Sequence, residues 1–291
     1  MPRVITTRAE LRAALGDEAP GLVPTMGALH AGHAALIARS AAENSRTVVS
    51  IFVNPGQFSD SADLAAYPRD LQRDVDLAVR YGAELIFAPP VDEVYPPGFA
   101  TAIEVAGVAE PWEGTFRPGH FRGVATVVTV LLNLVRPARS YFGEKDYQQV
   151  AVIRRIHADL ALPGEIIACP TVRDADGLAV SSRNTQLATD ERTRAAIIPR
   201  ALFHMAELAH RGEHDAETLL ECGYRVLSED PELVIEYLAV VDGETLGPIG
   251  SVRMGARALL AVRLGSVRLI DNIALDAGGP PGEGAVGVLG G

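Results

Sequence analysis

Two histidines, His30 and His33, stand where a short apolar stretch gives way to a helix-forming one. The apolar stretch covers residues 22–25, and the run 34–38 (AALIA) favours a helix. The first turn of a helix has unpaired backbone N–H groups and the positive end of the helix dipole, so it attracts anions. Gly32 lets a flat ligand approach the backbone, and two imidazoles add donors for phosphate oxygens. The spacing therefore predicts a phosphate-binding strand–turn–helix; the plainer alternative is a pair of solvated helix caps.

A single lysine is the second chemical signal. Of the 26 basic residues, 25 are arginine and one is Lys145, which lies in the segment 142–149 (FGEKDYQQ). An ammonium is a compact cation on a flexible stem, and it can neutralise charge that builds up on a phosphoryl oxygen. Asp146 follows at an expected helix start, where it can cap the helix or hold a ribose hydroxyl. We therefore expect a second phosphate-binding turn; the alternative is a surface turn with mixed charges.

Two further segments carry polar side chains. The segment 171–184 begins with Thr-Val-Arg and ends with Val-Ser-Ser-Arg-Asn, so that two hydroxyls and a guanidinium can serve a triphosphate. The segment 53–58 (VNPGQF) contains Gln57, and Gln149 follows the lysine turn; both are amides that donate and accept hydrogen bonds. Taken alone, each is open to a plainer interpretation, a polar hairpin end or a surface glutamine.

Strands and helices alternate along the first 170 residues, which predicts an α/β fold with a doubly wound, Rossmann-like parallel sheet. In such sheets ligands bind beyond the carboxyl ends of the strands, where the loops 26–33, 54–58 and 143–149 are expected. The helix at 123–135 is apolar enough for the core or for a subunit interface. The expected strands cover 22–25, 46–53, 84–87, 101–105, 140–142 and 165–168, and the other expected helices cover 7–15, 32–44, 68–82 and 146–157.

The rest of the chain predicts a smaller α+β domain, with its boundary between residues 171 and 172 and its end at residue 276. The expected elements are a helix at 189–211 capped by Thr189, a helix at 216–228, a strand at 234–241 and a hairpin of strands 258–264 and 266–273. The tail 277–291, with seven glycines and two prolines, is expected to be disordered.

Composition argues against several classes of protein. The net charge of −11 disfavours nucleic acid as a partner, because binding to a phosphate backbone needs a basic face. No apolar run reaches the roughly 18 residues of a membrane span. The two cysteines, Cys169 and Cys222, have no metal-ligand spacing, and without a secretion signal they favour a cytoplasmic protein.

Two groups of possible metal ligands are weaker signals. Asp70, Asp74 and Asp76 could help to hold a metal, but a solvated helix face explains them better. Three histidines between residues 204 and 214 lack the carboxylate that would complete a metal site. We therefore predict no metal ligands from the protein itself.

The four polar segments together resemble one family. The strings P-T-M-G-A-L-H-x-G-H at 24–33, V-N-P-x-Q-F at 53–58 and F-G-E-K-D-Y-Q-Q at 142–149 are similar to those of the pantoate–β-alanine ligase (pantothenate synthetase) family, within the H-x-G-H nucleotidyltransferase superfamily. The family's M-S-S-R-N reads Val-Ser-Ser-Arg-Asn at 180–184, a departure that concerns only the packing of Val180. The resemblance extends over about residues 5–276.

The resemblance implies an ATP-dependent ligase. Pantoate would attack the α-phosphorus of ATP to give pantoyl adenylate and pyrophosphate, and the β-alanine amine would then give pantothenate and AMP. His33, as proton donor, would be catalytic together with His30 and Lys145. Mg²⁺ would accompany ATP on phosphate oxygens and water, the C-terminal domain would close over the ATP site, and the protein would be a homodimer.

The resemblance also assigns binding residues. Pantoate would be bound by Gln57 and Gln149, since neutral amides suit its two hydroxyls and its carboxylate. Arg117 and His120, in another similar segment, could border the pocket. ATP would be bound by Met26, Gly27, Ala28, Leu29, His30, Ala31, Gly32, His33, Gly143, Glu144, Lys145, Asp146, Val172, Val180, Ser181, Ser182 and Arg183.

Two other functions stay open. An adenylyltransferase that acts on a phosphorylated substrate would need extra cations in place of Gln57 and Gln149. A non-catalytic nucleotide-binding regulator would have no need of Lys145 and would bind ATP without turnover. Pyrophosphate release with pantoate alone, followed by AMP release when β-alanine is added, separates the ligase from both.

Overall fold

The computed structural model describes residues 3–58 and 61–275, and these fall into two compact units. The first unit comprises Met1–Glu144 and Gln148–Cys169, and the second comprises Lys145–Tyr147 and Pro170–Gly291. The division after Cys169 lies close to the boundary expected at 171/172, but the sequence does not predict that Lys145–Tyr147 groups with the second unit. The Gly-rich tail at 277–291 lies outside the described residues.

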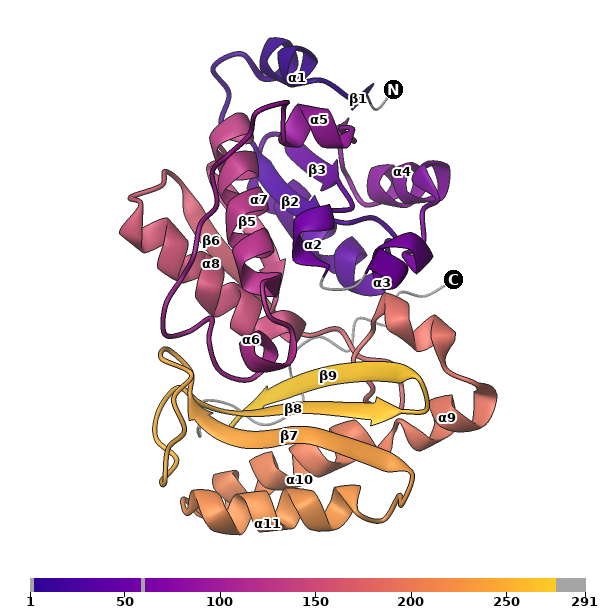
Figure 1. The fold of residues 1–291 in the computed structure, drawn as a ribbon, viewed down its shortest axis with the longest axis vertical. Helices are drawn as coiled ribbons and strands as arrows, with labels where there is room; N and C mark the ends of the chain where they lie inside the picture. The colour runs from indigo at the N-terminus through magenta and orange to yellow at the C-terminus, as the bar shows by residue number, and fades with distance from the viewer. Residues whose placement is uncertain (1–2, 59–60, 276–291) are drawn as a thin grey trace. The chain divides into compact units, whose positions relative to one another are not determined.

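The first unit is built on a six-stranded parallel sheet with helices on both faces (Figure 1), which confirms the predicted doubly wound fold. The strand order is β1-β4-β3-β2-β5-β6. β1 is too short, at three residues, to show a pattern in the sequence. The strands are β1 (Arg3–Ile5), β2 (Gly21–Thr25), β3 (Thr47–Ile51), β4 (Leu85–Phe87), β5 (Arg139–Gly143) and β6 (Glu165–Cys169).

Alternate residues of the strands belong to two separate cores. Leu22 of β2 and Val48 of β3 pack in a cluster with α1 (Arg8–Leu15), α7 (His120–Val135) and α8 (Tyr147–Asp159). Val23 and Val49 pack instead with α2 (Ala31–Glu43) and α4 (Leu71–Arg80). This period-two alternation puts helices on both faces of the sheet. The helices are α1 (Arg8–Leu15), α2 (Ala31–Glu43), α3 (Ser61–Ala66), α4 (Leu71–Arg80), α5 (Val91–Val94), α6 (Glu113–Phe116), α7 (His120–Val135) and α8 (Tyr147–Asp159), with the 3-10 turns η1 (Pro55–Gln57) and η2 (Glu144–Asp146).

Two elements of the first unit differ from the sequence-based expectation. The segment 101–105 is not a strand, and one of its N–H groups donates to the Thr126 hydroxyl of α7 at 3.0 Å in place of a strand partner. α4 begins at Leu71 rather than at Pro68, because Asp70 caps the helix by accepting a backbone N–H at 3.1 Å. The apolar character of α7 is explained by burial, since its inner face lies in the core of this unit.

The direction of strand addition reverses between β2 and β5. From β2 the chain moves outward to β3 and β4, and it then returns to β5, which pairs with the other edge of β2. Open parallel sheets bind ligands beyond the carboxyl ends of the strands at such a switch point. The loop after Thr25 and the end of β5 at Gly143 leave the sheet side by side at this point.

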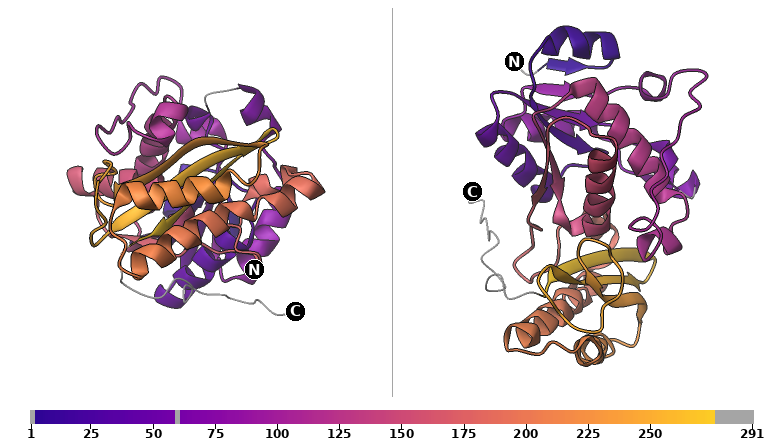
Figure 2. Two further views of the ribbon diagram at one scale, coloured as in Figure 1. Left: turned by 90° about the horizontal axis from the view of Figure 1, so that it is seen from below. Right: turned by 90° about the vertical axis from the view of Figure 1, so that its left-hand side faces the viewer.

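The second unit is a small α+β domain. Its antiparallel sheet has the order β7 (Leu233–Asp242), β8 (Ala256–Leu264) and β9 (Val267–Ala274), and α10 (Ile197–His210) and α11 (Ala216–Leu227) cover one face (Figure 2, left). The remaining elements are η3 (Ser182–Gln186) and α9 (Thr189–Arg194). Val267 and Leu269 of β9 lie in the core shared with the helices, so Arg268 and Asn272 belong to the opposite face of the sheet.

The expected hairpin of β8 and β9 is confirmed, but the expected helix at 189–211 is two helices. Pro199 has no N–H and cannot bond back to Ala195, which lies in the tight turn between α9 and α10. Ala188, rather than Thr189, stands at the cap of α9. Within the part of the chain that the structure describes, no helix is long and apolar enough to cross a membrane.

Candidate active site

The two histidines of the H-x-G-H turn hold each other and the start of α2. His30 is the N-cap residue, and its Nδ1 accepts the Gly32 N–H at 3.1 Å; Nδ1 of His33 accepts the His30 N–H at 3.3 Å. The ring centroids lie 4.1 Å apart. Because each Nδ1 accepts a hydrogen bond, each neutral ring carries its proton on Nε2. The histidines are therefore helix caps, as the plainer interpretation expects, and phosphate binding by their Nε2–H groups stays a prediction.

Glycine at position 32 is required by the His30 ring. A Cβ there would lie 2.9 Å from Cε1 of His30, closer than packed carbon atoms approach one another. The small residue thus serves the protein's own histidine, in addition to the ligand approach expected from the sequence.

A buried carboxylate fixes the loop between β2 and α2. Asp74 of α4 is 2% exposed, and it accepts the Ala28 N–H at 2.9 Å and the Leu29 N–H at 2.7 Å. Ala28 has φ +51°, an uncommon value for a residue with a Cβ, and Gly27 could not carry a Cβ, which would lie 2.8 Å from Asp74 Oδ2. Two charge-assisted hydrogen bonds hold this shape.

Asp74 does not belong to a solvated helix face, which corrects the expectation from the sequence. The sequence contains a signal for this: Asp74 stands next to Val75 and four residues before Ala78, on the stripe that α4 buries. A carboxylate on a buried stripe requires partners, and backbone N–H groups are the partners here. Within residues 3–58 and 61–275, no three His, Cys, Asp or Glu side chains gather as metal ligands.

Gln57 lies against the H-x-G-H loop. Its side chain is buried, its Nε2 donates to Sδ of Met26 at 2.9 Å, and its Oε1 accepts from Nδ2 of Asn54 at 3.0 Å. The structure therefore brings together a residue predicted to bind pantoate and a residue predicted to bind ATP. The loops after β2 and β3 meet here, as the switch-point argument requires.

A buried polar network holds the Gln57 loop. Asn54 donates to the Gly123 carbonyl at 3.1 Å and accepts from the Tyr95 hydroxyl at 2.8 Å. Burial raises the pKa of Tyr95 to about 12, so its hydroxyl stays a donor. His120 donates from Nδ1 to the Gln57 carbonyl at 3.0 Å, because a carbonyl can only accept. His120 was expected only to border the pocket, and Asn54 and Tyr95 had no assigned role.

The two neighbouring glutamines of α8 have different environments. Gln148 is buried, and it bonds the Glu113 N–H at 3.0 Å and the carbonyls of Val108 and Pro111 at 2.9 and 2.7 Å. It therefore anchors the segment before α6. Gln149, the residue predicted to bind pantoate, is half-buried on the first turn of α8.

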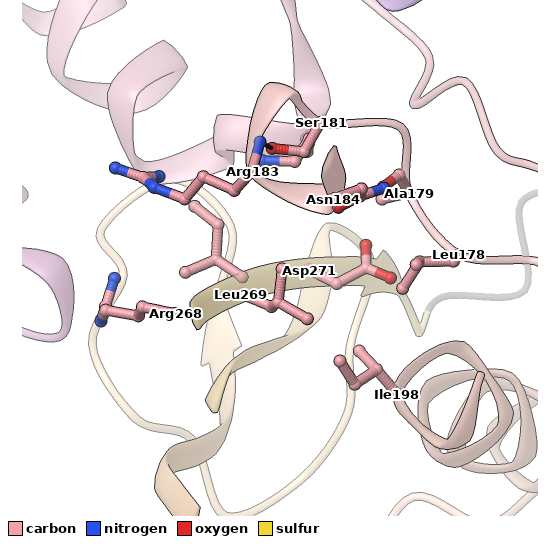
Figure 3. A pocket seen from close by; sticks show the side chains of 11 residues that line it. Leu178, Ala179, Ser181, Arg183, Asn184, Ile198, Arg268, Leu269 and Asp271 are labelled. Atoms are coloured by element: carbon pink, nitrogen blue, oxygen red, sulfur yellow. Dashed lines mark hydrogen bonds between the residues drawn. The ribbon is translucent and has the colours of Figure 1, made fainter. Parts of the chain in front are cut away.

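A pocket of the second unit is lined by predicted residues from separate parts of the sequence. Lys145, Ser181 and Arg183 line it together. Figure 3 shows Ser181 and Arg183 at the pocket. Ser181 caps η3 by accepting the Arg183 N–H at 3.3 Å. Arg268 of β9 also lines the pocket, held by Glu236 at 2.6 Å, although the sequence does not single it out. The other lining residues are Leu178, Ala179, Asn184, Ile198, Leu269, Ile270 and Asp271.

The segment that carries Ser181 and Arg183 is tied to β9 by a buried ion pair. Arg173 contacts Asp271 through two nitrogens, at 2.6 and 2.9 Å, and lies over the Phe203 ring at 5.1 Å. The Val180 N–H donates to the Val172 carbonyl at 2.9 Å, so the substituted position 180 is used through its backbone. This two-point pairing gives Arg173 a structural role, which Lys could not reproduce with the same geometry.

The predicted site residues are divided between the two units. The first unit holds Met26 to His33, Gln57, Gly143, Glu144 and Gln149; the second holds Lys145, Asp146, Val172 and Val180 to Arg183. Contacts join Gln57 to Met26 in the first group, and one pocket joins Lys145 to Ser181 and Arg183 in the second. That both groups serve one nucleotide stays a prediction.

Comparison with known proteins gives a consistent family. A family model described as pantoate-beta-alanine ligase matches residues 3–274. The pantothenate synthetase of Thermus thermophilus is 52% identical over 272 residues, which cover 93% of this chain and 98% of that protein. The pantothenate synthetase of a Roseiflexus species is 50% identical over 277 residues, 94% of this chain and all of that protein.

Solved structures give the same result. The crystal structure of the pantothenate synthetase from Thermus thermophilus has a TM-score of 0.91 at 50% identity, covering 94% of this chain and 99% of that one. A pantoate-beta-alanine ligase from Francisella tularensis, solved in complex with beta-gamma ATP and beta-alanine, has a TM-score of 0.78 at 33% identity and covers 96% and 100%.

Proposed function

Because the chain belongs to the pantoate–β-alanine ligase family, it is an enzyme that joins pantoate to β-alanine at the expense of ATP, and we propose that the two residue groups described above carry out this reaction through a pantoyl adenylate. A carboxylate is a poor electrophile toward an amine because it cannot expel oxide. Transfer of the adenylyl group to the carboxylate supplies a leaving group, AMP. The protein then has mainly to position the reactants and to stabilise developing charge.

The observation that carries the proposal is the pair of histidines at the start of α2. In the first step a pantoate carboxylate oxygen bonds to the α-phosphorus of ATP, and the bond to pyrophosphate breaks. His30 and His33 have Nε2–H donors on neutral rings, next to the N–H groups of a helix start. These N–H groups stabilise the charge on the phosphates by hydrogen bonds, and the step needs no proton from either ring.

The pocket of the second unit supplies the cations for the same step. Lys145 and Arg183 stabilise the negative charge of the pentacoordinate phosphorus and of the departing pyrophosphate, and the Ser181 and Ser182 hydroxyls contribute further hydrogen bonds. The backbone of residues 26–33 lines the adenosine. In the second step, the β-alanine amine attacks the acyl carbon and AMP leaves with the bridging oxygen.

Two glutamines are proposed to bind pantoate. Gln57 is buried beside Met26, so a hydroxy acid bound there would lie next to the nucleotide loop. Gln149, half-buried on α8, would bind the other end of the substrate. Neutral amides can serve hydroxyls and a carboxylate without the cations that a phosphorylated substrate would require.

Mg²⁺, a homodimer and a cytoplasmic location complete the proposal. Mg²⁺ enters with ATP, and its ligands would be mainly phosphate oxygens and water, because this small cation gives up its waters reluctantly and is commonly bound through substrate phosphates. It would neutralise part of the triphosphate charge. The resemblance to the family supports the dimer, which light scattering of the purified protein would test.

An ordered assay tests the function. With ATP, Mg²⁺ and pantoate alone, we expect one equivalent of pyrophosphate per active site. Adding β-alanine should then release AMP and pantothenate. Pyrophosphate release that requires a phosphorylated substrate would favour an adenylyltransferase, and ATP binding without any pyrophosphate release would favour a regulator.

A further inference from the structure

The segment Lys145–Tyr147, here called the lysine segment, is held by the second unit. In sequence it joins β5 to α8, but by its contacts it groups with residues 170 onward. The Lys145 side chain is 16% exposed and lines the pocket of that unit. Because a lysine has a long flexible stem, the position of its ammonium depends on how firmly the backbone beneath it is held.

Asn272 of β9 holds that backbone. Its side chain is buried, and its Nδ2 donates to the Lys145 carbonyl at 3.0 Å. Its Oδ1 accepts from Arg257 at 2.5 Å. A guanidinium has only donors and a carbonyl only accepts, so the Asn272 amide fits this place in one orientation only. An ionised carboxylate has no donor and an aliphatic side chain has neither group, whereas a hydroxyl would have to make both contacts from a single atom.

The other end of the lysine segment is fixed by the same arginine. The Arg257 guanidinium lies over the Tyr147 ring at 3.8 Å, and the Tyr147 hydroxyl donates to the Gly243 carbonyl at 2.9 Å. Arg257 therefore contacts both Tyr147 and Asn272. The segment is held at its first residue by a hydrogen bond and at its last by a cation–π contact.

Asn272 also connects the lysine segment to the Ser-Ser-Arg segment. Its carbonyl accepts from Arg173 at 3.2 Å, and the preceding residue, Asp271, forms the paired contact with the same arginine. Lys145 and Ser181 line one pocket. One position of β9 thus contacts both elements that line this pocket.

We propose that Asn272 is a positioning residue that holds Lys145 for adenylyl transfer. This inference rests on the proposed role of Lys145. A displacement of about 1 Å at a reacting centre can cost on the order of 100-fold in rate. Asn272→Ala should therefore lower the single-turnover rate of pyrophosphate release by about 10- to 100-fold, while the Kd of pantoate stays within about twofold.

The test is a double-mutant cycle with Lys145→Ala, measured as pyrophosphate release in a single turnover with pantoate and ATP. If Asn272 acts through Lys145, the double variant is no slower than Lys145→Ala alone, because there is no ammonium left to misplace. A general loss of structure would slow both backgrounds equally. Asn133→Ala is the matched control: this exposed asparagine also donates to a carbonyl, that of Thr129, and should leave the rate unchanged.

The outcomes are distinct. An unaltered rate in Asn272→Ala, or losses that multiply in the double variant, would overturn the inference while leaving the ligase function in place. A normal rate in Lys145→Ala would overturn the role of the lysine itself. If Asn272→Ala does not fold, Arg257→Met removes the partner that orients the amide, and the same non-additivity with Lys145→Ala is expected.

Discussion

The H-x-G-H loop of the first unit and the lysine segment of the second are held by the same device with opposite polarity. In the first unit the buried carboxylate of Asp74 accepts the N–H groups of Ala28 and Leu29; in the second the buried amide of Asn272 donates to the Lys145 carbonyl. Hydrogen bonds to a charged group contribute about 1.5–3 kcal/mol, against about 1 kcal/mol for neutral ones. We therefore infer that Asp74 fixes its loop more firmly than the Asn272 amide by itself fixes the lysine segment.

The two anchors suit the different side chains that they position, the stiff rings of His30 and His33 and the flexible stem of Lys145. The histidines act through short, stiff rings on a helix start, so the loop before them has to keep one shape. Lys145 has four rotatable bonds above a backbone that is held in place, so its ammonium can follow a phosphate that moves during reaction. In both units the anchor comes from a distant element, 46 residues from Ala28 and 127 residues from Lys145.

Removing the lysine should have the largest effect and sets the scale for the second unit. Lys145→Ala should lower the rate of pyrophosphate release by at least ~100-fold, a typical cost of losing one donor to a transition state. The measurement is rapid quench with saturating ATP and pantoate. Near-normal pyrophosphate production by this variant would show that Lys145 does not act in adenylyl transfer.

Breaking the carboxylate anchor should have the next largest effect. In Asp74→Asn the amide NH₂ would face one of the two loop N–H groups, which leaves a buried donor without an acceptor and costs about 1–3 kcal/mol of stability. We expect a fall in the melting temperature and a loss in adenylation rate of about 10- to 50-fold.

Asp76→Asn is the control, since Asp76 is on the same helix and accepts a hydrogen bond from the exposed Gln72. Equal behaviour of the two variants would show that α4 does not fix the histidine loop through Asp74.

A smaller effect is expected at Gln57, which is predicted to bind pantoate and contacts Met26 of the predicted ATP loop. Gln57→Ala removes hydrogen bonds to pantoate but leaves the backbone of the ATP loop intact. Isothermal titration should show pantoate binding weakened by about tenfold, or about 1.4 kcal/mol, and ATP binding by much less. Equal losses of affinity for pantoate and ATP would show that Gln57 supports the shape of the loop rather than binding pantoate.

The smallest effect is expected at Tyr95, whose hydroxyl donates to Asn54 beneath the Gln57 loop, and it is an effect on stability that depends on pH. Because burial raises the pKa of Tyr95 to about 12 in the folded state, its contribution is fully present below pH ~10, where the unfolded tyrosine begins to ionise. The contribution is lost as the pH rises from about 10 to 12. Tyr95→Phe should therefore reduce the free energy of unfolding at pH 8 by about 1 kcal/mol. Between pH 8 and pH 11, the free energy of unfolding should fall less in this variant than in the parent.

Urea unfolding at the two pH values measures this difference, and Tyr224→Phe, at an exposed tyrosine, is the control. If Tyr95→Phe and the parent lose stability in parallel, the hydroxyl does not support the Asn54 network.

The sequence predicts most of the fold because the hydrophobic patterns are local. β3 is a buried run rich in β-branched residues, and the repeat of strands and helices is sufficient to indicate a doubly wound sheet. The failures are also local: β1 is too short to show a pattern, and a proline divides the helix expected at 189–211. The strand expected at 101–105 fails because the Ile103 N–H bonds to a helix side chain rather than to a neighbouring strand.

The sequence predicts the reactive groups of the site but not the groups that hold them. His30, His33 and Lys145 stand out by type and spacing, and Ser181 and Arg183 by their motif. The sequence places Asp74 on a solvated face, gives Asn54 no role of its own within the segment 53–58 and does not mark Asn272, because an anchor is defined by the distant backbone that it contacts. A polar residue within an apolar pattern, such as Asp74 beside Val75, is the signal that was available.

The adenylate is the central claim, and oxygen transfer tests it most directly. Pantoate labelled with ¹⁸O in both carboxylate oxygens should be converted with ATP and β-alanine, and the phosphate of AMP should be examined by mass spectrometry. The account predicts one ¹⁸O in AMP and one in the amide carbonyl of pantothenate, because the carboxylate oxygen that attacks the α-phosphorus leaves with AMP. AMP without ¹⁸O, or label found in inorganic phosphate, would contradict it.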